Sequence, residues 1–132
     1  MQGLHLTADL SGCDASQALM RDPATLRRQC LKAVDQAGLQ SVAELFHAFE
    51  PAGSGITGVV LLAESHLAVH TWPELGAVTL DIYVCNFSGN NSAKAHQLMQ
   101  QLQQAFAPRS VQAQQLKRGL PAADPAGPAP RA

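Results

Sequence analysis

A serine, a histidine and a cysteine stand within one short segment of the chain. Ser65 follows Glu64 and offers a hydroxyl nucleophile. His70 comes five residues later and can transfer protons near neutral pH. Cys85 ends an alternating stretch behind a Trp-Pro-Glu turn and offers a thiol. We expect these three side chains to meet across neighbouring strands.

Two common kinds of site fit this segment poorly. A serine hydrolase needs a turn of the type Gly-x-Ser-x-Gly, and no glycine flanks Ser65 at positions 63 or 67. His66, His70 and Cys85 have donor atoms that bind zinc, and the two histidines share a strand face, but no second ligand pair stands nearby. Histidines with structural hydrogen bonds are the preferred interpretation, and no metal is predicted.

The composition is that of an ordinary globular protein. The chain has 132 residues, 46% of them hydrophobic, and a formal net charge of -1, so no basic excess favours nucleic acid as a partner. The longest purely apolar run, residues 59–63, is far shorter than the roughly 20 residues of a membrane span. From the pattern of its first residues we expect no secretory leader, and three cysteines without a Cys-x-x-Cys pair fit a reducing compartment. We therefore predict a cytoplasmic protein that does not bind membranes.

Alternation and helical spacing predict the elements around this segment. Asp22 and Pro23 begin a helix that Gly38 ends, and an apolar stripe between Ser92 and Pro108 predicts a second helix. Strands are predicted at 2–9, 41–49, 57–63, 65–71, 77–85 and 110–117, the third and fourth being one bent strand or a strand and its continuation.

Short connections between the middle strands favour antiparallel pairing. We predict an α+β fold, a two-layer sandwich of a mainly antiparallel sheet with both helices on one face. Residues 1–118 form one domain, and the Pro- and Ala-rich residues 119–132 are predicted to be a disordered tail.

The central segment resembles a known family. Glu64-Ser-His-Leu-Ala-Val-His-Thr-Trp-Pro-Glu74, followed by the stretch 77–85, is similar to the processing segment of the small prokaryotic S-adenosylmethionine decarboxylases, which are pyruvoyl-dependent proenzymes. A looser similarity covers about the first 115 residues. The resemblance implies self-cleavage between Glu64 and Ser65 and conversion of Ser65 into a pyruvoyl group, with no external cofactor.

The resemblance also implies roles for single residues. The Ser65-derived ketone would form a Schiff base with the substrate amine, His70 would transfer protons during processing, and Cys85 would return a proton to the substrate. A thiol is mostly protonated at neutral pH, which suits that last task. Glu74 would bind the ribose hydroxyls of the substrate, and Phe49 would stack on its adenine ring. The product would be the aminopropyl donor for spermidine synthesis.

Two copies of the cleaved chain are expected to form a homodimer, again by resemblance, with residues from both completing each site. The loop 51–58 is longer than the family pattern, and Asn86 stands where a glycine commonly follows the cysteine. Because both positions flank the expected pocket, arginine or ornithine stays an alternative small-molecule substrate. An unprocessed, non-catalytic relative that regulates a partner is an alternative of another class.

Overall fold

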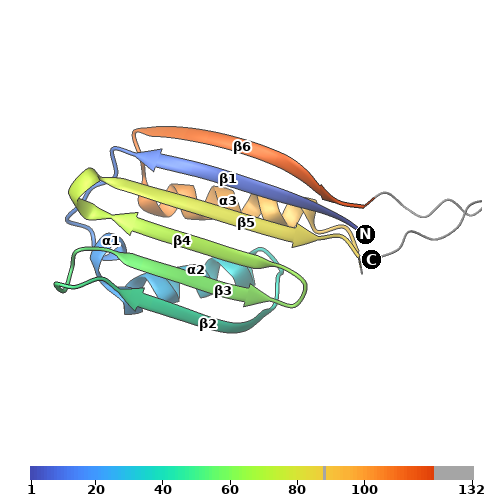
Figure 1. Cartoon of the computed structure of the whole chain (residues 1–132), viewed down its shortest axis with the longest axis horizontal. Coiled ribbons are helices and arrows are strands. Elements are labelled where there is room, and N and C mark those ends of the chain that lie inside the picture. The colour runs from blue at the N-terminus through green and yellow to red at the C-terminus, as the bar shows by residue number, and fades with distance from the viewer. Residues whose placement is uncertain (88, 121–132) are drawn as a thin grey trace, which may run out of the picture.

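A six-stranded antiparallel sheet, in the order β2-β3-β4-β5-β1-β6, forms one layer of the molecule, and the helices cover one of its faces (Figure 1). The computed structural model describes residues 1–87 and 89–120. The strands are β1 (Gln2–Ser11), β2 (Ser41–Ala48), β3 (Ile56–Leu62), β4 (His66–Trp72), β5 (Ala77–Cys85) and β6 (Ser110–Gly119). The helices are α1 (Ala18–Arg21), α2 (Pro23–Gln36), the 3-10 helix η1 (Pro73–Leu75) and α3 (Ser92–Phe106). The predicted α+β sandwich with its helices on one face is confirmed.

The helix α2 begins where its sequence predicts. The Asp22 side chain accepts a hydrogen bond from the Thr25 backbone N–H at 3.3 Å, and Pro23 occupies the first turn, where a missing N–H costs nothing. The apolar stripes of α2 and α3 face the sheet and are buried against alternate residues of β1, β3, β4 and β5. These residues are Leu26, Cys30, Ala33 and Val34 of α2, and Ala95, Leu98, Met99, Leu102 and Phe106 of α3.

None of the helices in residues 1–87 and 89–120 covers the opposite face of the sheet, and we call it the open face (Figure 1). Apolar side chains project from it at three strands. Leu45 on β2 is 76% exposed, Leu61 on β3 is 49% exposed, and Leu116 on β6 is 56% exposed. The neighbours of Leu45 and Leu61 in the sequence, which are Phe46, Val60 and Leu62, pack in or against the core. Because successive side chains of a strand point to opposite faces, Leu45 and Leu61 must point to the open face.

The structure corrects the prediction for the middle strands and adds two elements. The chain reverses between β3 and β4, which pair antiparallel as a hairpin with Leu61 opposite His66, so they are neither one bent strand nor a strand and its continuation. The short helices α1 and η1 give little signal in the sequence because each spans a single turn. The strand β6 reaches Gly119, and residues 121–132 of the predicted tail lie outside the described residues. No helix in the described ranges is long and apolar enough to span a membrane.

Candidate active site

Ser65 lies at the tip of the β3–β4 hairpin. The Leu62 N–H donates to the Ser65 carbonyl at 2.9 Å, and the Ser65 N–H donates to the Leu62 carbonyl at 3.4 Å. Ala63 and Glu64 are therefore the two loop residues, and both are exposed. The Ala63 N–H donates to the Gln40 carbonyl at 3.2 Å, which ties the tip to the connection between α2 and β2. The Glu64–Ser65 bond thus sits at a turn held on both sides.

The structure brings Ser65 and Cys85 together. The Cys85 N–H donates to Ser65 Oγ at 3.1 Å, so the hydroxyl is held in one place while its own hydrogen stays available to a base. The Asn91 side-chain amide donates to the Cys85 carbonyl at 2.9 Å. The backbone of Cys85, whose residue is only 8% exposed, is therefore fixed through both its N–H and its carbonyl.

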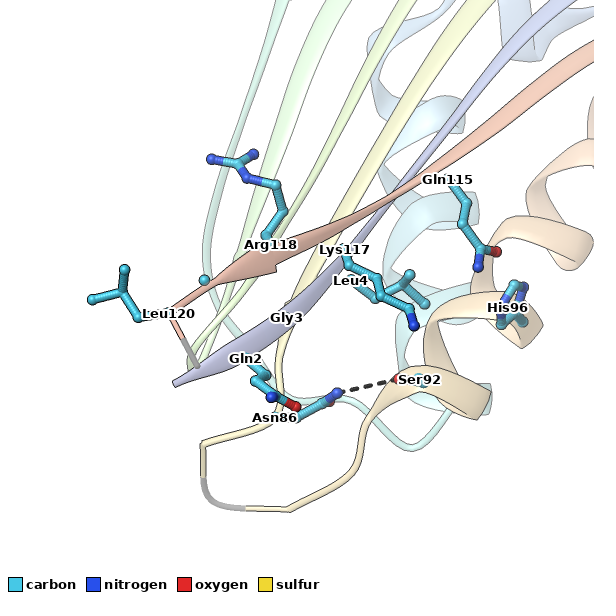
Figure 2. A pocket seen from close by; sticks show the side chains of 11 residues that line it. Gln2, Gly3, Leu4, Asn86, Ser92, His96, Gln115, Lys117, Arg118 and Leu120 are labelled. Carbon is cyan, nitrogen blue, oxygen red and sulfur yellow. Dashed lines mark hydrogen bonds between the residues drawn. The ribbon is translucent and has the colours of Figure 1, made fainter. Parts of the chain in front are cut away.

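Asn86 supports this arrangement from the loop that follows β5. Its side-chain oxygen accepts the Asn91 backbone N–H at 2.8 Å, and its amide donates to Ser92 Oγ at 3.2 Å (Figure 2). Asn91 occupies the N-cap position of α3, but its side chain makes no capping hydrogen bond to the helix. The side-chain amide instead donates to the Cys85 carbonyl. The asparagine that departs from the family pattern thus orders the loop beside the cysteine.

Asn86 also lines a cavity of about 500 Å³ between α3, β1 and β6 (Figure 2). Lys117 points to the same side of β6 as α3, whereas Arg118 points to the other side (Figure 2). Neither Ser65 nor His70 lines this cavity. This cavity lies on the helix side of the sheet, apart from the predicted catalytic residues Ser65 and His70.

His70 lies on the open face, toward the far end of β4. Its Nδ1 atom is 3.1 Å from Thr57 Oγ1 on β3, and its ring stacks on Trp72 at 5.6 Å with an interplanar angle of 18°. Both contacts fix the ring plane and leave Nε2 for proton transfer. Phe49 follows β2 at the same end of the sheet, and Glu74 is exposed in η1 just beyond β4.

One chain therefore holds the predicted residues in two groups. Ser65 and Cys85 lie at one end of the sheet, and His70, Glu74 and Phe49 lie toward the other. His70 is five positions along the strand from Ser65, which corresponds to about 16 Å at roughly 3.3 Å per residue. Of the three side chains expected to meet, only Ser65 contacts Cys85 within one chain, and it does so through the Cys85 backbone N–H and not through the thiol.

Aromatic and charged side chains gather on the open face around Tyr83, two residues before Cys85. The Tyr83 ring lies 5.7 Å from the His66 ring, and the Arg118 guanidinium lies 5.7 Å from the Tyr83 ring centroid. Asp81 Oδ1 is 3.0 Å from His5 Nε2. The carboxylate of Asp81 is therefore already engaged with a neighbouring strand.

The other two cysteines lie in the core. Burial raises the pKa of Cys30 to about 12 and also raises the pKa of Cys13 above its ordinary value. Both thiols therefore stay protonated and are weaker acids than an ordinary cysteine, and Cys85 is the cysteine next to Ser65. Within residues 1–87 and 89–120, no three His, Cys, Asp or Glu side chains gather where they could hold a metal ion.

Two residues of this site are not predicted from the sequence. Thr57 is the first residue of the predicted strand 57–63, and its contact with His70 follows from the pairing register of β3 with β4. Asn91 precedes the second predicted helix, and its hydrogen bond to the Cys85 carbonyl follows from the path of the loop. Neither contact has a local sequence signal.

Comparisons with known proteins identify the family of this chain. The family model described as S-adenosylmethionine decarboxylase matches residues 4–119. The chain belongs to the S-adenosylmethionine decarboxylase family. The predicted family resemblance is thus confirmed.

Relatives named S-adenosylmethionine decarboxylase proenzyme cover most of the chain. The protein of Aquifex aeolicus (strain VF5) is 39% identical over 119 residues, which are 89% of this chain and 82% of the relative. The protein of Methanococcus maripaludis (strain C7) is 34% identical over 118 residues, 89% of this chain and 90% of the relative. The crystal structure of the adenosylmethionine decarboxylase from Aquifex aeolicus superposes with a TM-score of 0.81 at 35% identity, covering 92% of this chain and 94% of that one. The S-adenosylmethionine decarboxylase fold is therefore shared over nearly the whole length.

Proposed function

We propose that this chain is a proenzyme that cuts its own Glu64–Ser65 bond, converts Ser65 into a pyruvoyl group and decarboxylates S-adenosylmethionine. The observation that carries the proposal is the hydroxyl of Ser65, which the Cys85 N–H holds at the hairpin tip, in a chain whose relatives are named proenzymes. The hydroxyl needs to reach only the carbonyl carbon of the preceding residue. Self-cleavage therefore requires no partner for the nucleophile itself.

The surroundings of Ser65 suit a pyruvoyl group. The residue is half-buried at the end of β4 beside a fixed backbone N–H, and a new N-terminus at this turn would leave β3 and β4 paired. When present, a pyruvoyl group supplies a ketone that accepts the electron pair released as a carboxyl group leaves. Cys85 is the cysteine whose backbone N–H contacts Ser65 Oγ, and its thiol would return a proton to the substrate, whereas Cys13 and Cys30 lie in the core.

Two copies paired through their open faces would complete each site. The exposed Leu45, Leu61 and Leu116 supply apolar surface for such an interface. A two-fold axis that lies between the sheets and across the strands reverses the strand direction, so His70 of the partner subunit comes over Ser65. Packed sheets lie about 10 Å apart, within reach of side chains from both layers. The homodimer thus accounts for the separation of the two groups in one chain.

The same pairing would bring Phe49 of the partner subunit and Glu74 of the partner subunit to the open face beside Cys85. A phenylalanine face suits adenine, and a carboxylate suits ribose hydroxyls. Arginine or ornithine would need a carboxylate near the far end of its chain, and Asp81 is already paired with His5 at 3.0 Å. These features favour the nucleoside substrate.

The test of this function begins with the mass of the purified protein. We expect two chains that correspond to residues 1–64 and 65–132, and carbon dioxide release from S-adenosylmethionine but not from arginine or ornithine. If the protein released carbon dioxide only from arginine or ornithine, the assignment of S-adenosylmethionine as the substrate would be wrong. A chain that stays whole and inactive would instead support the non-catalytic alternative.

The role of Cys85 gives a separate prediction. Cys85→Ala should still be cut at Glu64–Ser65, because its backbone N–H remains, but decarboxylation should fall about 100-fold or more as the proton donor is lost. Cleavage is measured on a denaturing gel and turnover by carbon dioxide release. Cys13→Ala is the matched control and should keep its turnover. Equal turnover in Cys85→Ala and the control would remove Cys85 from this role.

A further inference from the structure

A second cavity, of about 200 Å³, adjoins the proposed cleavage point on the helix side of the sheet. The hairpin tip forms one wall, and the connection after α2 and the start of α3 form the others. The lining residues are Gly38, Leu39, Gln40, Leu62, Ala63, Glu64, Ser65, Asn91 and Lys94. Both residues of the Glu64–Ser65 bond therefore border a space that the open face does not include.

Lys94 is the one cation among the described residues that line this cavity. Its side chain runs along the backbone at Gly38, where a Cβ atom would lie 3.6 Å from Lys94 Cε. The ion pairs between described residues are His5–Asp81 and Arg27–Glu44, so the ammonium group is not committed to either. The Asn91 side chain, by contrast, already donates to the Cys85 carbonyl. Lys94 is thus the group that can respond to a new negative charge here.

Self-cleavage creates such a charge at the cavity wall. In the uncut chain, the Ser65 N–H donates to the Leu62 carbonyl, and the Glu64 carbonyl belongs to a neutral amide. After cleavage the main chain ends at Glu64 with a carboxylate. A carboxylate at this half-enclosed place is stabilised by a charged donor far more than a neutral amide is.

We propose that Lys94 receives the main-chain carboxylate of Glu64 and so stabilises it as the leaving group of the processing reaction. The inference rests on the proposed self-cleavage. First, Ser65 Oγ bonds to the Glu64 carbonyl carbon, the C–N bond breaks, and the nitrogen takes the hydroxyl proton, which gives an ester. A base then removes the Ser65 Cα proton, the electron pair forms the Cα–Cβ double bond, and the Cβ–Oγ bond breaks.

Oγ departs in that step as one oxygen of the Glu64 carboxylate. The remaining enamine takes up a proton at Cβ to become an imine, and water replaces its nitrogen, which leaves as ammonia, to give the ketone. Negative charge gathers briefly on the Glu64 carbonyl oxygen in the tetrahedral intermediate of ester formation, and it becomes lasting only on the carboxylate that leaves in the elimination step. Lys94 therefore acts most strongly on elimination and less on ester formation.

The test compares Lys94→Met with Lys94→Arg and with Lys32→Met, an exposed lysine of α2 away from the cavity. Each protein is followed from synthesis on a denaturing gel, and samples are treated with hydroxylamine, which splits an ester but not an amide. We expect Lys94→Met to be processed about tenfold more slowly, the usual scale for losing one hydrogen bond to a charged group. Lys94→Arg should recover most of the rate, and Lys32→Met should match the wild-type chain.

The accumulated material identifies the step that Lys94 assists. In Lys94→Met, hydroxylamine should split the uncut chain and release a fragment that begins with an ordinary serine at position 65, whereas normal processing leaves a ketone there. Wild-type processing in Lys94→Met would overturn the inference, as would slow processing with hydroxylamine-resistant material. If the wild-type chain itself never cleaves, the proposed function fails. If it cleaves and Lys94→Met keeps pace, only the role of Lys94 fails.

Discussion

A Ser65→Ala chain is expected to stay whole under every condition that splits the wild-type chain into residues 1–64 and 65–132. Without Oγ, no side-chain atom next to the scissile carbonyl can attack it, so neither the ester nor the ketone forms. The fold should persist, because alanine fits the half-buried position and only the hydrogen bond from the Cys85 N–H is lost. That loss costs about 1 kcal/mol of stability.

The measurement is the intact mass after prolonged incubation, together with carbon dioxide release from S-adenosylmethionine, which should be absent. Ser110→Ala, at the exposed start of β6, is the matched control and should be cut like the wild-type chain. Cleavage of Ser65→Ala at the same bond would mean that an outside nucleophile or a protease makes the cut. The pyruvoyl proposal would then fall.

The elements of this fold are predicted well where the signal is local. Asp22 and Pro23 begin α2 as expected, and the alternation of 77–85 gives β5 its exact bounds. The order of the strands is not local. It depends on pairs such as Gly3 with Cys85 and Gln2 with Gly119, which join distant parts of the chain, and no short pattern specifies them.

The contacts of the candidate site also fall into those that the sequence predicts and those that it does not. Ser65 and Cys85 are predicted to meet because a short turn joins their strands, and the structure places them in contact. The predicted strand 65–71 already implies about 16 Å between Ser65 and His70, at roughly 3.3 Å per residue, so the expected contact between these two residues within one chain is inconsistent with that strand. The hydrogen bond from the Asn91 side chain to the Cys85 carbonyl depends on the path of the loop, which only the folded chain defines.

His70 lies far from Ser65 within one chain. We therefore expect that two chains, each unable to cleave itself alone, restore cleavage when they form a mixed dimer. His70→Ala alone should be cut very slowly or not at all, since both copies in its dimer lack the histidine. Ser65→Ala alone cannot be cut. When the two are produced together, a mixed dimer has one site in which Ser65 of the His70→Ala chain faces His70 of the partner subunit. The His70→Ala chain should then be cut, while the Ser65→Ala chain stays whole.

A size tag on the His70→Ala chain lets a denaturing gel report which chain is cut. The matched control pairs it with a Ser65→Ala chain that also carries His70→Ala, so no histidine remains at any site, and no cleavage should follow. Random pairing makes about half of the dimers mixed. Cleavage of the His70→Ala chain should therefore be easy to detect, because the control mixture shows none. If His70 acted on the Ser65 of its own chain, neither mixture would yield a cut chain. Failure of the first mixture, with mixed dimers shown to be present, would therefore refute the proposed exchange of residues across the open faces.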